Sequence, residues 1–556
     1  MKDFVLKHDS VRVVQTAIKY ANPEQKRIIA QELAGSYRQL AESRYAKFLI
    51  GKLLVQNDDE IRDIIVPEFF GHVRRLIKHP EASWILDDVY RGIATKQQKA
   101  IILREWYGAE FALFDKGEAA TGELTEILAA EPGKRAPIMK SLQELINHLI
   151  QKKMTGFTLL HDAMLQYFLN VKPGTEEISD YLELIEGDEE GDLLKNLAFT
   201  KSGARVVCLA LAYGTAKDRK KILKTYKDTL QMMAADANGH KVILTAYETI
   251  DDTKLSGKSI FPELLSKDAD KQVENVVNAA NDPYARTTLL YLFQGKSKSL
   301  FPPNLNTTLE LLAEIETARA ATSKKDPEIR RTELIKAVSA DLLKAIEVAA
   351  ADLVATSFGC QFVTEVLFHA EGDKTAALKA VAETAGGDPT YTQPAPAVVE
   401  EGAEAELEEP SPSSHIATQA WGGRMFKSLI AGGRFDPATK SIKLIEPPLN
   451  FADILYPNIE DNIVEWATGS SSFVPLALLE SPSFSSKDAL LKKLKENKKK
   501  LEKAAKEETP EQKLKREEFE EKMAKEGDDK KKSKKMKGGK ERKVGNEGSS
   551  LLLALL

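Results

Sequence analysis

The sequence predicts an all-α protein, an α-solenoid of about eleven stacked helical repeats. Three observations predict this fold class. An apolar spacing typical of a helix recurs at intervals of 36 residues, a second amphipathic segment precedes each copy, and strand signals are absent because the β-branched residues fall within helical periods. Helices that cannot bury their apolar faces alone are expected to stack, so that each repeat covers its neighbour.

The repeating segment is clearest in SRYAKFLIGKLL, residues 43–54. Its apolar side chains share one helical face, while Lys47, Phe48 and Gly51 fall on the opposite face. The core positions of this copy are Leu49, Ile50, Leu53 and Leu54.

The same segment returns along the chain. VRVVQTAI (11–18) lies 36 residues before KFLIGKLL (47–54), and SWILDDVY (83–90) lies 36 residues after it. FTLLHDAM (157–164) follows 74 residues later, which leaves room for one degenerate repeat. In the first copy the core positions are Val13, Val14, Ala17 and Ile18. The remaining copies are ARVVCLAL (204–211), HKVILTAY (240–247), CQFVTEVL (360–367), GRMFKSLI (423–430) and SSFVPLAL (471–478), with a weaker copy near 284–293.

Repeats and composition divide the chain into four regions. Residues 1–110 hold repeats 1–3 and are basic, with 18 Lys and Arg against 15 Asp and Glu. Residues 111–300 hold repeats 4–8, some of them degenerate, and residues 301–480 hold the C-terminal repeats. A segment rich in Pro, Gly, Ser and Glu at 385–414 is expected to be a disordered acidic insertion, and 481–556 a charged tail that ends in an apolar cap.

The tail has a strong positive charge. Residues 487–556 contain 23 Lys and Arg against 15 Asp and Glu, which favours a polyanionic partner. Residues 492–523 are compatible with a single exposed helix, and 527–543 are expected to be disordered and to bind polyanions. The closing LLLALL (551–556) is expected to pack against the last repeat.

The sequence gives no sign of an enzyme, a metal site or a cofactor site. SGKS (256–259) lacks the glycine that a phosphate-binding loop needs at position 252, which is Asp252. The eight histidines show no metal-ligand spacing, and Cys208 and Cys360 fit small buried apolar positions. Two cysteines cannot form a disulfide framework, so a reducing compartment is expected.

No N-terminal signal peptide is visible, and no apolar run approaches the roughly 20 residues that span a bilayer, so no membrane partner is predicted.

HDSVRVVQTAIKY (8–20) and SRYAKFLIGKLL resemble the second helix of Pumilio-homology (Puf) repeats. FGHVRRLIKHPEASWILDDVY (70–90), TGFTLLHDAM (155–164), FGCQFVTEVL (358–367) and GSSLLLALL (548–556) resemble, in their order and spacing, the Puf-A/Penguin branch of that family. The resemblance implies a bent or L-shaped solenoid with a C-terminal Penguin-type (CPL) segment. It also implies a nuclear, mostly nucleolar protein that acts in precursor-rRNA processing and large ribosomal subunit assembly.

Puf proteins that read sequence use two or three side chains per repeat for each base. They are the two residues before the core pair and the one after it, which we call the first, second and third positions. The triads of this chain are Val11/Arg12/Gln15, Lys47/Phe48/Gly51, Ser83/Trp84/Asp87, Phe157/Thr158/His161, Ala204/Arg205/Cys208, His240/Lys241/Leu244, Cys360/Gln361/Thr364, Gly423/Arg424/Lys427 and Ser471/Ser472/Pro475.

The base-reading residues are mostly missing from these triads. Gln15 is the sole amide at a third position, and Asp87 with Ser83 comes nearest to a guanine reader but is one methylene short. The cations and aromatic residues that remain suit phosphate contacts and base stacking without sequence preference. Phe48 and Trp84 would serve equally well in packing between repeats. The candidate RNA-binding residues are Arg12, Gln15, Lys47, Phe48, Arg74, Arg75, Lys78, Trp84, Arg205 and Lys241.

These residues predict a monomeric RNA-binding scaffold with little sequence specificity. The resemblance implies that it acts in the nucleus and nucleolus. The partners that the resemblance implies are precursor rRNA, with mRNA and, in vitro, DNA as further ligands, and ribosomal proteins or assembly factors. Two alternatives stay open: a sequence-selective translational repressor of mRNAs, and a protein-binding α-solenoid adaptor, because residues 111–480 are acidic and suit basic partners.

Overall fold

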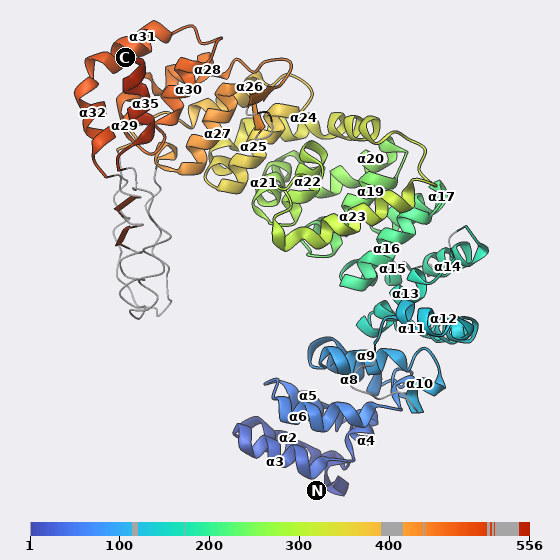
Figure 1. Ribbon diagram of the computed structural model, residues 1–556. Helices are drawn as coiled ribbons and strands as arrows, with labels where there is room; N and C mark the ends of the chain where they lie inside the picture. Colours follow the sequence, from blue (N-terminus) through green and yellow to red (C-terminus); the bar gives the residue numbers. More distant parts are fainter. Residues whose placement is uncertain are drawn as a thin grey trace. The chain divides into compact units, whose positions relative to one another are not determined.

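The computed structural model describes residues 2–113, 121–172, 174–188, 190–390, 415–436, 439, 441–508, 512–513, 516–517 and 544–556. These residues form stacked helices and one two-stranded sheet, which confirms the predicted fold class (Figure 1). The chain forms two compact units: unit 1 is Met1–Glu263 with Phe301–Arg330, and unit 2 is Leu264–Leu300 with Arg331–Leu556.

In unit 1 the repeated segments form helices that pack against one another in sequence order. We call these helices the second-helix layer of unit 1: α2 (His8–Tyr20), α5 (Lys47–Leu54), α8 (Ala82–Gly92), α13 (Thr158–Leu169), α16 (Lys201–Tyr213) and α19 (Gly239–Thr249).

Shorter elements and the first helices of the repeats connect the layer. They are α1 (Lys2–Val5), α3 (Pro23–Leu33), α4 (Tyr37–Glu42), α6 (Asp59–Ile65), η1 (Val66–Phe69), α7 (Val73–Leu76), α9 (Lys96–Arg104), α10 (Ala109–Leu113), α11 (Leu124–Ala130), η2 (Pro132–Lys134), α12 (Arg135–Gln151), α14 (Glu176–Glu186), α15 (Asp192–Ala198), α17 (Ala216–Thr225), α18 (Leu230–Ala234), α20 (Thr253–Leu264), η3 (Pro303–Leu305) and α23 (Asn306–Arg319).

Local capping fixes where several helices begin. The Asn22 side chain accepts from the Gln25 backbone N–H while the Gln25 side chain accepts from the Asn22 N–H, a capping box before α3. Thr95 and Gln98 form the same box before α9, and the Asp58 carboxylate accepts from the Ile61 N–H before α6. These side chains satisfy N–H groups that the helix itself leaves unpaired.

The predicted core of α5 is confirmed, because its four core side chains are at most 3% exposed. In α2 the prediction is half wrong: Val14 and Ile18 are buried, but Val13 is 62% exposed and Ala17 is also exposed. The physical reason is that, among the described residues, α2 packs against one second helix, α5, whereas α5 packs against two, α2 and α8.

The degenerate repeat predicted before residue 157 has no second helix in the layer. α13 packs directly against α8, although α9, α10, α11 and α12 lie between them in sequence. The Asp87 carboxylate of α8 accepts from the Leu159 N–H at 2.9 Å, and the Tyr90 hydroxyl donates to the Asp162 carboxylate at 2.5 Å. The extra residues therefore extend the connection and leave the stacking of second helices unbroken.

In unit 2 a second series of helices packs in the same way, each against the next. They are α22 (Ala285–Gln294), α25 (Ser357–His369), α27 (Ala420–Ala431), α30 (Phe473–Glu480) and α35 (Glu547–Leu555). The remaining elements are α21 (Ala269–Asn281), α24 (Pro327–Val354), α26 (Thr375–Glu383), η4 (Ile416–Thr418), β1 (Gly433–Asp436), β2 (Ser441–Leu444), α28 (Phe451–Ile459), η5 (Glu460–Asn462), α29 (Ile463–Thr468), α31 (Lys487–Glu496) and α32 (Lys498–Lys506).

The β-hairpin of β1 and β2 contradicts the expectation that the chain has no strands. The two strands are antiparallel, with Gly433 opposite Leu444, and each contains four residues. Gly432 ends α27 in the left-handed region, with φ of 64°, and turns the chain into β1. Segments of four residues are too short to show a two-residue period, which is why the pattern gives no strand signal.

The predicted charged tail is in part a packed helix pair. α31 and α32 are separated at Asn497, so residues 492–523 do not form one exposed helix. Leu490, Leu494 and Leu501 are fully buried, and α32 packs against α29 and α35. Residues 391–414 of the predicted insertion and all of 527–543 lie outside the described residues.

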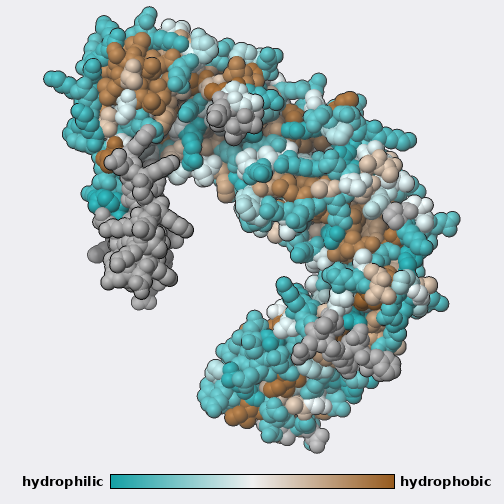
Figure 2. Space-filling view, in the orientation of Figure 1, coloured by the Kyte–Doolittle hydropathy of each residue, from teal (hydrophilic) through white to brown (hydrophobic). Residues whose placement is uncertain are grey.

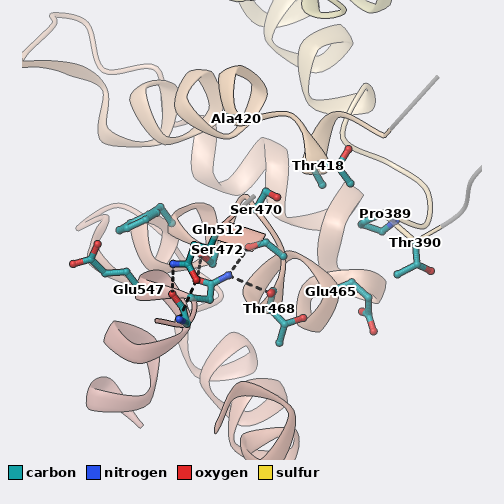
Figure 3. Close-up of a pocket in the computed structure, with 15 residues that line it drawn as sticks. Pro389, Thr390, Thr418, Ala420, Glu465, Thr468, Ser470, Ser472, Gln512 and Glu547 are labelled. Atoms are coloured by element: carbon teal, nitrogen blue, oxygen red, sulfur yellow. Dashed lines mark hydrogen bonds between the residues drawn. The ribbon is translucent and has the colours of Figure 1, made fainter. Parts of the chain in front are cut away.

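The predicted apolar cap is confirmed, because α35 packs against α29, α30 and α32 and Leu552 is fully buried. Polar contacts fix its N-terminus (Figure 3). The Asn546 amide donates to the carbonyls of Thr468 and Gly469 at 3.2 and 2.7 Å, and the Ser472 hydroxyl donates to the Asn546 oxygen at 2.6 Å. α35 therefore forms the last second helix of the stack described in unit 2.

Candidate nucleic-acid interface

Three successive second positions are exposed on the second-helix layer of unit 1. Arg12 on α2, Phe48 on α5 and Trp84 on α8 lie at equivalent places on helices that pack side by side (Figure 1). Phe48 is 53% exposed and Trp84 is 59% exposed, values that are high for large apolar side chains. A guanidinium and two aromatic faces thus line one surface, where they can contact a phosphate and stack on bases.

The environment of Phe48 is fixed by an ion pair. The Lys47 ammonium lies 2.6 Å from the Glu81 carboxylate and 5.2 Å from the centre of the Phe48 ring. This pair joins α5 to the residue that precedes α8, so it holds neighbouring repeats in register. Lys47 is thereby paired with Glu81 in the free protein, where it also lies beside Phe48, and its role as a phosphate contact stays a prediction.

Trp84 both packs and remains accessible. Its ring makes a T-shaped contact with Phe157, with ring centres 5.0 Å apart and planes at 75°. Phe157 is 1% exposed, so it forms a rigid support at the start of α13. Trp84 is nevertheless 59% exposed, so part of its ring remains available to stack on a base.

The first and third positions, by contrast, are largely buried. Ser83 and Asp87 are at most 5% exposed, and the Asp87 carboxylate caps α13 through the Leu159 N–H. Burial raises the pKa of Asp87 to about 6. Asp87 is therefore a structural cap, and the nearest approach to a guanine reader in the sequence is unavailable to a base.

The same holds further along the layer. His161 is fully buried between the Thr155 carbonyl and the Thr200 hydroxyl, each 2.8 Å from a ring nitrogen, and burial lowers its pKa to about 4. Cys208 is fully buried, and burial raises the pKa of its thiol to about 12. These positions support the packing of α13, α16 and α19 and do not reach the surface.

Arg205 and Lys241 also have intramolecular partners. Both the Nε and Nη2 atoms of Arg205 donate to the Glu314 carboxylate, at 3.0 and 2.9 Å. Glu314 lies on α23, which packs across α16 and α19. The Lys241 ammonium donates to the Asn238 side chain at 3.4 Å, and burial lowers its pKa. The structure therefore does not add Arg205 and Lys241 to the open surface near α2, α5 and α8.

The three basic residues predicted before α8, Arg74, Arg75 and Lys78, also differ in their exposure and in their partners. The Arg74 guanidinium donates to the Ser141 hydroxyl at 2.9 Å and is half-buried, so it ties α7 to α12. Arg75 is exposed but pairs with Glu42 at 2.9 Å, and Lys78 is exposed. Gln15 donates to the Tyr45 carbonyl at 3.1 Å and links α2 to the turn before α5.

One pair of site residues is absent from the sequence-based prediction. Arg44 lies with its guanidinium 5.7 Å from the centre of the Tyr45 ring, and both side chains are exposed just before α5. The signal was present as adjacent basic and aromatic residues, which recur at 19–20, 44–45 and 47–48. Arg44 and Tyr45 lie outside the triads, so a search limited to the repeat positions passes over them.

A cavity beside α35 does not suit a polyanion. Its volume is about 510 Å³, and its described lining includes the carboxylates of Glu465 and Glu547 but no Lys or Arg (Figure 3). Among the described residues no group of three or more His, Cys, Asp or Glu side chains is placed to hold a metal ion. None of the described helices combines the length and apolarity needed to cross a bilayer.

Comparison with known proteins places these features in context. Residues 281–440 match the CPL (NUC119) domain. The chain is 31% identical over 504 residues to Pumilio homology domain family member 6 of Schizosaccharomyces pombe, covering 91% of this chain and 72% of that protein. It is 31% identical over 387 residues to human Pumilio homolog 3, covering 69% of this chain and 56% of that protein.

Two solved structures are similar over most of the chain. The crystal structure of human Puf-A has a TM-score of 0.71 at 28% identity, covering 89% of each chain. The crystal structure of human Puf-A in complex with DNA has a TM-score of 0.70 at 28% identity, again covering 89% of each chain.

Proposed function

The chain belongs to the Pumilio homology domain family, and from that premise we propose that it is an RNA-binding scaffold with little sequence specificity. Its site is the surface of Arg12, Phe48 and Trp84, flanked by Arg44, Tyr45 and Lys78, which we call the N-terminal surface. The observation that carries the proposal is the difference in exposure between positions of the same triads. The second positions of α2, α5 and α8 are exposed, whereas Ser83 and Asp87 are buried.

Physical chemistry connects this contrast to the binding mode. An edge reader needs paired donors and acceptors beside the base, and these are used here to hold one repeat to the next. A cation contacts any phosphate, and an aromatic face stacks on any base. The structure of human Puf-A in complex with DNA supports a mode in which no 2′-hydroxyl is required.

We propose the nucleolus as the place of action and precursor rRNA as the ligand, with large ribosomal subunit assembly as the process. The similarity to the Pumilio homology domain relatives and the CPL (NUC119) match support this proposal. We assign no catalytic step, and ribosomal proteins or assembly factors are the proposed protein partners of a monomeric chain. Because the chain spans little more than half the length of human Pumilio homolog 3, the whole protein's activity is part of the proposal.

Crosslinking of the full chain to RNA in cells, followed by sequencing, tests the proposal. Precursor rRNA should supply most of the crosslinked sites, and the variant Arg12→Ala/Phe48→Ala/Trp84→Ala should lose most of them. A matched control is Ile28→Ala/Val55→Ala, which removes exposed aliphatic residues of the same repeats. Crosslinks concentrated on untranslated regions of a few messages would instead support a translational repressor.

A further inference from the structure

The outer side of α35 carries an exposed apolar stripe. Leu551 is 45% exposed and Leu555 is 52% exposed, although the neighbouring Leu552 is fully buried. Ala554 is also exposed, so the apolar residues stand at i, i+3 and i+4 on one helical face. Val544, just before the helix, is 59% exposed. Figure 2 shows apolar surface gathered over this part of the molecule.

The stripe lies where the other second helices of unit 2 are covered. α22 packs against α25, α25 against α27, α27 against α30, and α30 against α35. In α25, for example, Phe362, Val363, Val366 and Leu367 are fully buried. Among the described residues no further helix packs on the outer side of α35. This side therefore leaves exposed an apolar face of the kind that the next helix covers in the other repeats.

The charge beside the stripe indicates the kind of helix that fits. α32 packs against α35, and residues 487–508, which contain α31 and α32, hold nine Lys against five Asp and Glu. Lys498, Lys499 and Lys506 are exposed. A negatively charged partner is favoured beside these ammonium groups, and a second copy of the same face would bring like charges together. The exposed stripe is aliphatic, so it lacks the rings on which bases stack.

We propose that the outer face of α35, with the lysines of α32, binds an amphipathic helix of a partner protein. That helix carries Leu, Ile or Val along one face and Asp or Glu along its margins. It packs on Leu551 and Leu555 as the next helix of the stack, while its acids pair with the lysines. This surface is built from residues of unit 2 and the N-terminal surface from residues of unit 1, so protein and RNA can be held by different residues of one chain.

The test uses the full chain and a fluorescein-labelled, 18-residue helical peptide with leucines on one face and glutamates along both margins. A scrambled peptide of the same composition is the ligand control. In fluorescence anisotropy the amphipathic peptide should bind at least tenfold more tightly than the scrambled one. Leu551→Glu/Leu555→Glu should weaken binding of the amphipathic peptide at least tenfold. Lys498→Glu/Lys499→Glu/Lys506→Glu should weaken its binding about fivefold.

The control variant is Met232→Glu/Val348→Glu, which changes two apolar residues that are each 59% exposed elsewhere. It should bind the amphipathic peptide like the unchanged protein. Equal binding of the two peptides, or an unchanged affinity in Leu551→Glu/Leu555→Glu, would overturn the proposal. Competition by an oligouridylate would also overturn the proposal, because RNA would then be the occupant. So would a dimer in sedimentation that Leu551→Glu/Leu555→Glu abolishes, because a second copy would then be the occupant.

Discussion

At the scale of single residues, exposure separates binding from packing within one repeat motif. Asp87 and Trp84 lie three residues apart on α8, yet one is 5% exposed and caps the next helix while the other is 59% exposed. Lys47 and Phe48 are adjacent, and the first is held by Glu81 while the ring of the second faces solvent. The same motif therefore supplies both the contacts between successive repeats and the N-terminal surface.

Replacing an aromatic residue of the N-terminal surface should weaken binding regardless of sequence. Phe48→Ala and Trp84→Ala should each cost about 1–3 kcal/mol in affinity for single-stranded RNA, because each removes one stacking face. Fluorescence anisotropy with several unrelated oligonucleotides measures the effect, and Val55→Ala is the control because Val55 is exposed off the triads. A loss confined to one oligonucleotide would show that these rings read sequence.

Asp87→Asn should stabilise the protein near neutral pH. The pKa of Asp87 is raised to about 6 from 3.8, so ionising this carboxyl opposes folding. The cost is absent below pH 4, grows between pH 4 and 6 and is complete above pH 6, where Asn should raise the free energy of unfolding by up to about 3 kcal/mol. Asparagine keeps the oxygen that accepts from the Leu159 N–H.

Urea unfolding of both proteins from pH 4 to 8 measures this difference. RNA affinity should be unchanged in Asp87→Asn, since the side chain is buried. A stability difference that does not vary with pH would contradict the assignment of Asp87 as a buried cap, and a changed base preference would contradict its exclusion from the site.

At the scale of helices, the sequence predicts most of the fold and part of the site. The 36-residue spacing identifies α2, α5 and α8 because buried apolar faces must recur in every stacked repeat. The hairpin and the packing of α31 and α32 escape prediction, since four-residue strands and lysine-rich helices with few leucines have weak patterns.

The site is harder to predict than the fold because its partners are distant in sequence. Arg205 stands at a second position like Arg12, but Glu314, which pairs with it, lies 109 residues away on α23. No spacing rule connects these two residues. Pattern alone finds the cations at equivalent positions, and only the packing shows which of them are occupied.

Arg205→Ala tests the role of α23. Both members of the ion pair with Glu314 are partly exposed, so the variant should lose less than about 1 kcal/mol of stability. Its affinity for single-stranded RNA should stay within twofold of the unchanged protein, measured by anisotropy with Arg12→Ala alongside for comparison. A tenfold loss in Arg205→Ala would mean that RNA displaces Glu314 and extends along α16.

The two faces of α35 should respond differently to truncation. Leu552→Ala removes a fully buried side chain and should cost about 2–5 kcal/mol of stability. Leu551→Ala, one residue away and 45% exposed, should change stability by less than about 0.5 kcal/mol. Thermal and urea unfolding of the full chain provide both values, and equal effects would contradict the packing of α35 as the last second helix.

At the scale of the whole molecule, the chain combines a basic N-terminal surface, a stack of helices and a lysine-rich C-terminal helix pair. The first 110 residues hold more basic than acidic side chains, and so do residues 487–508. The excess of cations in both segments favours polyanions and acidic partners. A stack of repeats suits this task because each repeat adds surface without changing the fold of its neighbours.

The central claim is that the N-terminal surface holds a nucleic acid by charge and stacking and does not read its sequence. The affinity of the full chain for a panel of single-stranded RNAs of equal length, measured from 50 to 300 mM salt, tests it most directly. Affinities should agree within about threefold at each salt concentration, and the logarithm of the affinity should fall linearly with the logarithm of the salt concentration. Arg12→Ala should reduce the magnitude of this slope by about one. Affinity that is insensitive to salt, or one sequence preferred a hundredfold over the others, would contradict it.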